Sequence, residues 1–557
     1  MKIKLILLFL AISFTAMAQL EGTRYVVIFK DKNNSPFSYD RPLEFLSQKA
    51  IDRRAKFNIP LDKHDLPVNP SYVTQVKQAG GEIVGTLKWF NGVILKNPSE
   101  TVLANIAALS FVKEVLPGLP KTTKGTENTL GNYDIEGIPP YSFSQNNEYY
   151  PRYKSQTGVF DYGNALNQIA MIKMDELHNL GYTGKGITIG VLDGGFANTN
   201  IINGFDSLFL QNRILGTFDA AEKGNDVFAS TMNGHGTSVL SVMGANRPGL
   251  IVGSAPHASY WLIRTEVTGQ ESRIEEYQWS IGAAFADSVG VDVINSSLGY
   301  TQFDNSLYNY TYEMMDGNTA VVTRAADIAV SKGILVVNSA GNEGSSQWKY
   351  IGAPADGDSV LTVGATNYKG YWASFSSWGP TFDGRIKPDV SAQGSGTWLL
   401  MSTGTAQGGN GTSFSSPLIA GSMACLMQAL PNYSPMKLIK LIRSTSSYSS
   451  NPNDTLGYGI PNFKLALTTS GINNPDYTNK SLTLYRSSET QLTLLSAVSL
   501  GKSVIEIYTA SGSLAIKEDL NITQGSQTIT LPKSLSSGVY IIRVSSNDFR
   551  ESHKIVL

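Results

Sequence analysis

Three residues could together carry out nucleophilic chemistry: Asp193, His235 and Ser413, which occur in that order along the chain. Each lies in a glycine-rich, turn-prone stretch, namely VLDGG, NGHGTS and GTSFSSP. A serine hydroxyl is a weak nucleophile at neutral pH, so it needs a base within hydrogen-bond reach and an acid that holds the tautomer of that base. These residue types supply the three roles, which predicts an acyl-enzyme formed on the serine.

His235 is the best candidate for the base, because it alone among five histidines is framed by glycines that let the backbone come close. The other four are better explained as surface or packing residues: His64, His178, His257 and His553. Ser413 stands where a loop of small residues becomes an apolar helix. A helix start leaves backbone N–H groups unpaired, and these can point at the reacting carbonyl.

The three stretches resemble the active-site signatures of the subtilisin-like serine proteases, the subtilases. The resemblance implies hydrolysis of protein or peptide substrates by a triad of Asp193, His235 and Ser413, with no cofactor required for the chemistry. Asn342, in the stretch AGNEG, resembles the oxyanion motif of the family. With the backbone N–H of Ser413, its side chain would form the oxyanion hole.

Further residues resemble the substrate-binding parts of subtilases. Ser297, Leu298 and Gly299 resemble the segment that pairs with the substrate backbone as an added strand. The other expected contacts are Ala340 and Gly341 before the oxyanion asparagine, and Gly352 with Pro354 in the wall of the specificity pocket. We expect a pocket of moderate size. Glu343 either lines it or faces solvent, so the primary-site preference stays open.

One position departs from the family pattern. Subtilases commonly have a hydroxyl residue directly after the catalytic aspartate, and Gly194 stands there in this chain. We therefore expect one hydrogen bond that would help orient the carboxylate of Asp193 to be missing.

Two other functions were weighed against a protease. A catalytically inactive, surface-bound binding protein of the same fold would be favoured by loss of a triad residue, but all three are present. A lipase of the α/β-hydrolase type shows Gly-x-Ser-x-Gly and the order serine, acid, histidine. Here Ser413 is followed by Phe414 and Ser415, and the order is the reverse.

The region from about Asn167 to Leu467 alternates short β-rich runs with helical ones, which predicts an α/β fold with a parallel sheet covered by helices on both faces. The expected strands are Ile187–Leu192, Tyr260–Arg264, Val291–Asn295, Ile334–Asn338 and Val360–Val363, and the clearest helices are Glu275–Val289 and Ala320–Ser331. Ligands bind at the carboxyl ends of strands in such sheets. Asp193 directly follows one expected strand, and Asn342 lies just past another.

The N-terminal part reads as an exported pro-segment. Residues 1–18 have the charged start, short apolar run and Ala-x-Ala end of a signal peptide. Residues 19–120 predict a small α+β domain that resembles the propeptides of subtilases, implying a folding chaperone that also inhibits the enzyme; an unrelated binding module is the alternative. Residues 121–155 predict an exposed linker in which maturation cleavage would be easiest. The catalytic domain would span residues 156–470.

A polar linker over residues 471–480 precedes a segment, 481–557, that alternates in period two and predicts a β-sandwich. This segment resembles the C-terminal sorting domain of type IX secretion, and a plain accessory β domain is the alternative. The resemblance implies export through the periplasm, contact with the type IX machinery and a secreted or cell-surface enzyme.

Size and charge narrow the range of partners. A chain of 557 residues is longer than a single hydrophobic core accommodates, so we expect at least two folding units. The net charge of −1 gives no field to attract nucleic acid or an anionic membrane.

Cys425 is the single cysteine and lies in an apolar run, where we expect a buried hydrophobe rather than a thiol nucleophile. We expect a monomer, and structural calcium stays open because no acidic loop has diagnostic ligand spacing.

Overall fold

The computed structural model describes residues 24–118, 158–470 and 482–556, apart from short gaps at 223, 225, 268, 270, 489–490, 497–498, 524, 533–534, 536–537 and 547–548. The expected signal peptide at residues 1–18 and the expected linkers at residues 121–155 and 471–480 lie outside the described residues. Within the described part of the chain, no helix is both long enough and apolar enough to cross a membrane.

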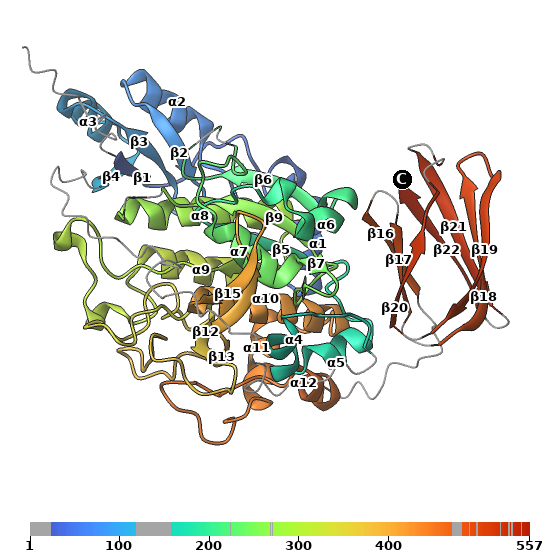
Figure 1. Cartoon of the computed structure of the whole chain (residues 1–557). Coiled ribbons are helices and arrows are strands. Elements are labelled where there is room, and N and C mark those ends of the chain that lie inside the picture. Colours follow the sequence, from blue (N-terminus) through green and yellow to red (C-terminus); the bar gives the residue numbers. More distant parts are fainter. Residues whose placement is uncertain are drawn as a thin grey trace, which may run out of the picture.

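A parallel sheet forms the centre of the catalytic part, with the described strands in the order β13-β12-β11-β10-β5-β9-β6 (Figure 1). The strands are β5 (Thr188–Asp193), β6 (Ile214–Asp219), β9 (Ser259–Arg264), β10 (Val293–Ser296), β11 (Leu335–Ser339), β12 (Leu361–Thr366) and β13 (Val390–Gln393). β5 lies between β9 and β10. Asp193 therefore emerges from the middle of the sheet, at the carboxyl edge.

Helices cover both faces of this sheet, as the alternation of the sequence predicted. One face carries α4 (Leu166–Met171), α5 (Met174–Asn179), α7 (His235–Gly244), α10 (Thr412–Ala429), α11 (Pro435–Ser444) and α12 (Phe463–Thr469), and the other carries α8 (Arg273–Val289) and α9 (Val321–Ser331). Successive strand residues point to opposite faces. Val191 accordingly packs in the first core and Leu192 in the second. The α/β fold class is confirmed.

Shorter elements complete the catalytic part. They are η2 (Thr199–Ile201), η3 (Asn203–Phe205), α6 (Asp206–Leu210), β7 (Asn246–Arg247), β8 (Ile251–Val252), η4 (Ser306–Tyr308), η5 (Tyr312–Met314), β14 (Ser395–Leu400) and β15 (Ala406–Asn410). β14 and β15 form an antiparallel hairpin that leads directly into α10.

The N-terminal domain, residues 24–118, is an α+β unit as expected. Its antiparallel sheet has the order β2-β3-β1-β4. The elements are β1 (Arg24–Phe29), η1 (Pro42–Glu44), α1 (Gln48–Lys56), α2 (Pro70–Gln78), β2 (Ile83–Leu87), β3 (Gly92–Lys96), α3 (Glu100–Ala107) and β4 (Val112–Gly118). Val27 packs in the domain's own core, whereas its neighbour Val26 packs with Ile274 and Ile281 of α8. One face of the sheet therefore rests on the catalytic part.

The C-terminal part contains two antiparallel sheets with a shared apolar core, as expected for a β-sandwich (Figure 1). One has the order β16-β17-β20 and the other β19-β18-β21-β22. The strands are β16 (Leu482–Ser488), β17 (Gln491–Ser496), β18 (Gly501–Thr509), β19 (Leu514–Ile522), β20 (Gly525–Thr530), β21 (Val539–Ser546) and β22 (Phe549–Val556). Ile505 and Ile507 of β18 point inward together, as the period of two requires.

Candidate active site

Asp193 ends the fully buried strand β5, and its carboxylate is completely enclosed. Both carboxylate oxygens face Nδ1 of His235, at 2.9 and 3.0 Å. The backbone N–H of Gly194 donates to Oδ1 of Asp193 at 2.7 Å. A main-chain donor therefore holds the carboxylate at the position where the sequence led us to expect a missing hydrogen bond.

His235 is the first residue of α7, and its neighbour Gly236 lets the helix pack against the end of β5. The side-chain oxygen of Asn233 accepts from the N–H of His235 at 2.7 Å and anchors the start of the helix. A Cβ on Gly236 would lie 2.4 Å from the carbonyl oxygen of Gly195 and 3.0 Å from Cβ of Asp193. Only glycine lets the helix approach the aspartate this closely, which explains the glycine that follows His235 in the sequence.

Ser413 lies in the first turn of α10 and is 1% exposed. Oγ of Ser297 donates to its carbonyl oxygen at 3.0 Å, which ties the helix start to the end of β10. The ring of the next residue, Phe414, has its centroid 6.0 Å from that of His235. The helix start and the imidazole therefore lie beside each other at the carboxyl edge of the sheet.

Asn342 lies just past β11, with its side chain oriented by the start of α10. Its Oδ1 accepts from both the N–H and the Oγ1–H of Thr412, each at 2.9 Å. Because an amide is planar, fixing Oδ1 on Thr412 also fixes the direction of Nδ2. A Cβ placed on Gly411 would lie 3.6 Å from Nδ2 of Asn342 and 3.6 Å from the backbone nitrogen of Ser413. Two donors thus border one small space, which is the arrangement that an oxyanion requires.

The expected substrate-binding residues come from three separate loops. Ser297 and Leu298 are buried, whereas Gly299 is exposed, and a Cβ there would meet only the carbonyl oxygen of Ala353, at 3.9 Å. The next residue, Tyr300, pairs antiparallel with Ala353, with N–H to O distances of 2.8 and 3.3 Å. An open backbone at Gly299 suits the pairing of an added strand.

The residues expected to border the specificity pocket lie close to the bridge between Tyr300 and Ala353 or to the end of β11. A Cβ on Gly352 would lie 2.8 Å from the methyl group of Thr301, so the side chain of that threonine occupies the space beside the glycine. Gly341 has a φ of +106°, and its N–H donates to Oγ1 of Thr412 at 3.2 Å. Ala340 before it is buried. All six expected residues therefore adjoin the ends of β10 and β11, or the bridge between Tyr300 and Ala353.

Glu266 was not anticipated from the sequence. It follows β9 and accepts hydrogen bonds from Oη of Tyr300 and, at 3.1 Å, from Oγ1 of Thr265. Burial raises the pKa of Glu266 to about 7, and the nearby charge of Asp193 acts in the same direction. A single glutamate without a motif gives no signal in a sequence. Because Glu266 accepts a hydrogen bond from Tyr300, it supports the segment Ser297–Gly299, along which we expect the substrate backbone to pair.

The other side chains that could carry out proton transfer or nucleophilic attack include His178 and Cys425, and both are buried in the core. His178 is fully buried between Oη of Tyr162 and the carbonyl oxygen of Ser254, and burial lowers its pKa to about 4. Burial raises the pKa of the Cys425 thiol well above its usual value, so this residue is a poor nucleophile, as expected. Among the described residues, no group of three or more His, Cys, Asp or Glu side chains is arranged to hold a metal ion.

Comparisons with known proteins agree with this geometry. The model of the subtilase family matches residues 184–459, that of the peptidase S8 propeptide domain of Bacteroidota matches residues 24–129, and that of the secretion system C-terminal sorting domain matches residues 488–557. Subtilisin E of Bacillus subtilis is 32% identical over 302 residues, which are 54% of this chain and 70% of that protein. Subtilisin DY of Bacillus licheniformis is 31% identical over 297 residues, 52% of this chain and 93% of that protein.

A solved structure extends the likeness in fold. Fervidolysin from Fervidobacterium pennivorans, a keratinolytic enzyme related to subtilisin, matches with a TM-score of 0.52 and 20% identity over 94% of this chain and 71% of its own.

The chain belongs to the subtilase family. It is a serine endopeptidase made with a propeptide domain and a type IX sorting domain, and this sorting domain indicates secretion or attachment to the cell surface. Nothing in the comparisons supports the inactive alternative.

Proposed function

We propose that Ser413 attacks the scissile carbonyl of a protein or peptide while His235 takes its proton and Asp193 holds the imidazole. The carbonyl oxygen, now negative, receives hydrogen bonds from Nδ2 of Asn342 and the N–H of Ser413. His235 then gives its proton to the leaving amine, and water hydrolyses the acyl-enzyme. The observation that carries this proposal is the contact of both Asp193 oxygens with Nδ1 of His235 beside the start of α10.

Substrates would bind with their backbone along Ser297, Leu298 and Gly299. The side chain before the cut bond would enter a pocket bordered by Ala340, Gly341 and Gly352. The exposed backbone of Gly299 supports this placement, because a strand can pair there without meeting a side chain.

The proposed order of parts in the chain is a signal peptide (1–18), an inhibitory propeptide domain (19–120), a linker (121–155), the catalytic domain (156–470), a second linker (471–480) and a sorting domain (481–557). The buried core of the catalytic part runs from Val159 to Leu467, which supports the limits of that domain. The signal peptide would direct export into the periplasm, and the type IX machinery would carry the protein onward. We expect the mature enzyme to act as a monomer.

The full chain, purified and left to process itself, tests the catalytic assignment. A fluorophosphonate probe should label the native protein, and Ser413→Ala should lose both labelling and peptide hydrolysis. Ser415→Ala is the matched control, because Oγ of Ser415 only donates to the carbonyl oxygen of Thr412, at 3.1 Å. Undiminished hydrolysis by Ser413→Ala would refute the assignment.

Members of this family need no cofactor for the chemistry. Structural calcium is a separate question, which unfolding measurements with and without a chelator answer directly. If a calcium ion binds only the folded enzyme, the chelator will lower the unfolding temperature without changing kcat of the protein that stays folded.

A further inference from the structure

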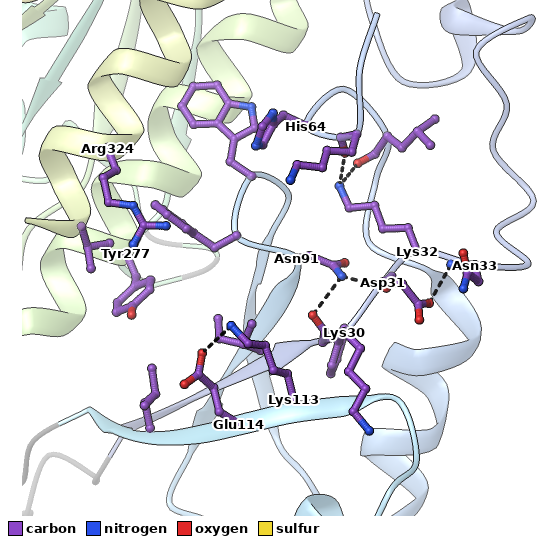
Figure 2. Close-up of a pocket in the computed structure, with 18 of the residues that line it drawn as sticks. Lys30, Asp31, Lys32, Asn33, His64, Asn91, Lys113, Glu114, Tyr277 and Arg324 are labelled. Carbon is purple, nitrogen blue, oxygen red and sulfur yellow. Dashed lines mark hydrogen bonds and ion pairs between the residues drawn. The ribbon is translucent and has the colours of Figure 1, made fainter. Parts of the chain in front are cut away.

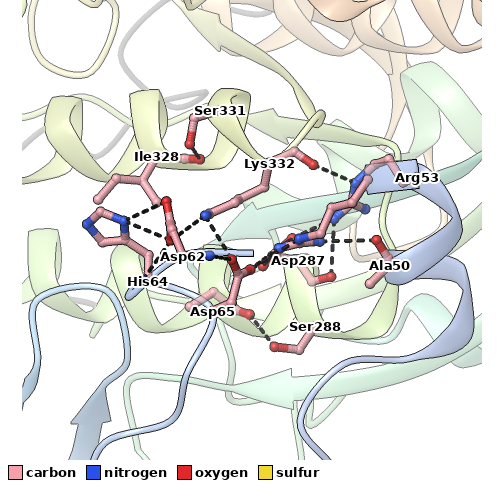
Figure 3. A network of polar contacts seen from close by, with 12 residues as sticks. Ala50, Arg53, Asp62, His64, Asp65, Asp287, Ser288, Ile328, Ser331 and Lys332 are labelled. Atoms are coloured by element: carbon pink, nitrogen blue, oxygen red, sulfur yellow. Dashed lines mark hydrogen bonds and ion pairs between the residues drawn. The ribbon is translucent and has the colours of Figure 1, made fainter. Parts of the chain in front are cut away.

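A cluster of charged side chains joins the N-terminal domain to the catalytic domain, and Figure 3 shows Arg53, Asp287 and Lys332 within it. We call it the charge network; its members are Arg53, Arg54, Asp62, Asp65 and Lys88 of the N-terminal domain and Asp287 and Lys332 of the catalytic domain. Both domains contribute positive and negative groups. Asp287 and Lys332 of the catalytic domain each find partners of opposite charge in the N-terminal domain.

Asp287, near the end of α8, is the centre of the network and is fully buried. Its carboxylate lies 2.5 Å from Arg53 and 2.7 Å from Arg54, with Lys88 at 3.9 Å. Burial would raise the pKa of Asp287, but the two guanidinium groups outweigh it and hold the pKa below its usual value. The aspartate therefore stays ionised in the interface, and it does so because of the arginines that α1 supplies.

Lys332, which directly follows α9 and is 1% exposed, completes the network on the side of the catalytic domain. Its Nζ donates to Asp62 at 2.7 Å and to Asp65 at 3.1 Å. Asp65 in turn accepts from Arg54 at 2.5 Å. The hydrogen bonds described for the side chain of Arg53 all cross the interface: besides Asp287, it donates to the carbonyl oxygens of Lys332 at 3.0 Å and of Val291.

One other part of the interface is packed less tightly. A cavity of about 770 Å³ lies between the N-terminal strands and the helices of the catalytic part, with Lys30, His64 and Phe90 on one side and Tyr277 and Arg324 on the other (Figure 2). The cavity is lined by charged side chains such as Lys30 and Arg324 and also by apolar ones such as Phe90, so water can enter this part of the interface. The charge network and the apolar contacts of Val26 with Ile274 and Ile281 are therefore the closely packed parts of the interface.

We propose that the charge network makes the catalytic domain recognise its own N-terminal domain and sets how slowly the two separate once the chain between them is cut. Removing one member of a buried ion pair leaves the other charge without water or partner, which costs more than the pair itself contributes. Separation must pass through such a state. A foreign N-terminal domain without both arginines would leave Asp287 uncompensated and be rejected. This inference rests on the proposed inhibitory role of the domain.

Arg53→Met in the full chain is the sharpest test, because it leaves the catalytic domain unchanged and removes only cross-domain polar contacts. After self-processing and dilution, the lag before peptide hydrolysis should shorten by about tenfold or more, because buried Asp287 loses one of its two guanidinium partners while Arg54 remains. Lys49→Met is the matched control on the same helix. Lys49 pairs with Asp292 across the same interface at 2.6 Å but is 41% exposed, so its loss should change the lag by about fivefold at most.

Asp287→Asn gives a second variant from the opposite domain and should shorten the lag as Arg53→Met does. kcat after full release should equal that of the native enzyme, since α8 places Asp287 about 18 Å along its axis from Glu275 at the end nearer the substrate edge. A lag that shortens no more in Arg53→Met and Asp287→Asn than in Lys49→Met would overturn the proposal.

A measurement without catalysis separates this proposal from the proposed function. In full chains that carry Ser413→Ala, amide hydrogen exchange of α1 and α8 should become faster on adding Arg53→Met and stay unchanged on adding Lys49→Met. Exchange in β1 and β3 reports whether the N-terminal domain remains folded. If the native chain hydrolyses nothing, the proposed function fails, while exchange still decides whether the charge network holds the domains together.

Discussion

At the scale of single residues, the orientation of Asn342 depends on Thr412. Because the amide oxygen accepts two hydrogen bonds from Thr412, the NH2 group of Asn342 is held in place near the backbone nitrogen of Ser413 before any substrate arrives. Donors fixed in advance stabilise charge without reorganising during the reaction. The oxygen of the Asn342 amide, which binds Thr412, and its NH2 group can therefore be tested separately.

Asn342→Ala should lower kcat by about 10²–10³, the loss measured on removing such a donor from a subtilisin, and leave KM nearly unchanged. Asn342→Asp keeps an oxygen for Thr412 but replaces the donor, so it should lose at least as much. Steady-state kinetics on one peptide substrate measures both. Equal kcat values for Asn342→Asp and the native enzyme would show that the amide does not contact the oxyanion.

Glu266 supports a second prediction at this scale, concerning stability against pH. Its pKa is raised in the folded enzyme to about 7, so the folded protein resists ionising it and becomes less stable as pH rises through that value. Glu266→Gln removes this cost. The unfolding temperature of the variant relative to the native enzyme should therefore be higher at pH 8 than at pH 5. A temperature difference that shrinks toward pH 8 would contradict the buried position of this charge.

At the scale of elements, the contact of α7 with the end of β5 sets the distance between His235 and Asp193. Gly236→Ala would place a methyl group 2.4 Å from the carbonyl oxygen of Gly195, so the helix must move away from the strand. Overpacking of this kind costs about 1–3 kcal/mol. We expect a lower unfolding temperature and a loss of kcat larger than the loss of stability alone explains.

Gly194→Ala is the control for that variant. Its Cβ would have Asn233 as its nearest neighbour, at 3.5 Å, an ordinary contact, and its N–H would still donate to Asp193. Unfolding temperature and kcat should stay close to native values. A large loss in Gly194→Ala and none in Gly236→Ala would mean that the helix position is set elsewhere.

The sequence predicted the elements whose pattern is local and missed those that depend on distant partners. The five expected strands begin within two residues of their observed starts. β6 and β13 were missed because β6 is a partly exposed edge strand and β13 reads Val-Ser-Ala-Gln without an apolar run. In the N-terminal domain, the pattern of residues 43–57 predicts one continuous helix, but Ser47 caps a new helix there by accepting from the N–H of Ala50.

The expected site residues were also selected from a local pattern in the sequence. Glycine-rich signatures mark Asp193, His235, Asn342 and Ser413, since close approach of backbones needs glycine nearby. The charge network could not be foreseen, because Arg53 and Asp287 lie 234 positions apart and neither has a motif. Such pairs are visible only once the N-terminal sheet is placed against α8.

At the scale of the whole molecule, the separate cores of the catalytic and C-terminal parts predict separable roles. A chain that lacks residues 481–557 should keep kcat and KM on peptides, because no expected site residue lies in that segment. In a bacterium with type IX machinery, the truncated protein should accumulate in the periplasm. Fractionation followed by a peptide assay measures both. Normal export of the truncated chain would remove the sorting role.

The interface between the N-terminal and catalytic domains should weaken in acid. Burial would raise the pKa of Asp62, but hydrogen bonds from Lys332 and from the N–H of His64 outweigh it and hold the pKa at about 2. The arginines act likewise on Asp287. A depressed carboxyl pKa stabilises the folded, docked state above the ordinary value near 4 and loses that contribution as pH falls through the depressed value.

We therefore expect the two domains of the full Ser413→Ala chain to stay docked from neutral pH down to about pH 4 and to come apart between about pH 4 and 2. Burial also lowers the pKa of His64, which lies beside Asp62, so this histidine stays neutral to a lower pH than an exposed histidine would. Hydrogen exchange of α1 across this range measures docking. Arg53→Met should undock at higher pH than the native interface, whereas Lys49→Met should follow it closely. Undocking that begins near neutral pH in the unmodified interface would show that the carboxylates of the charge network do not control it.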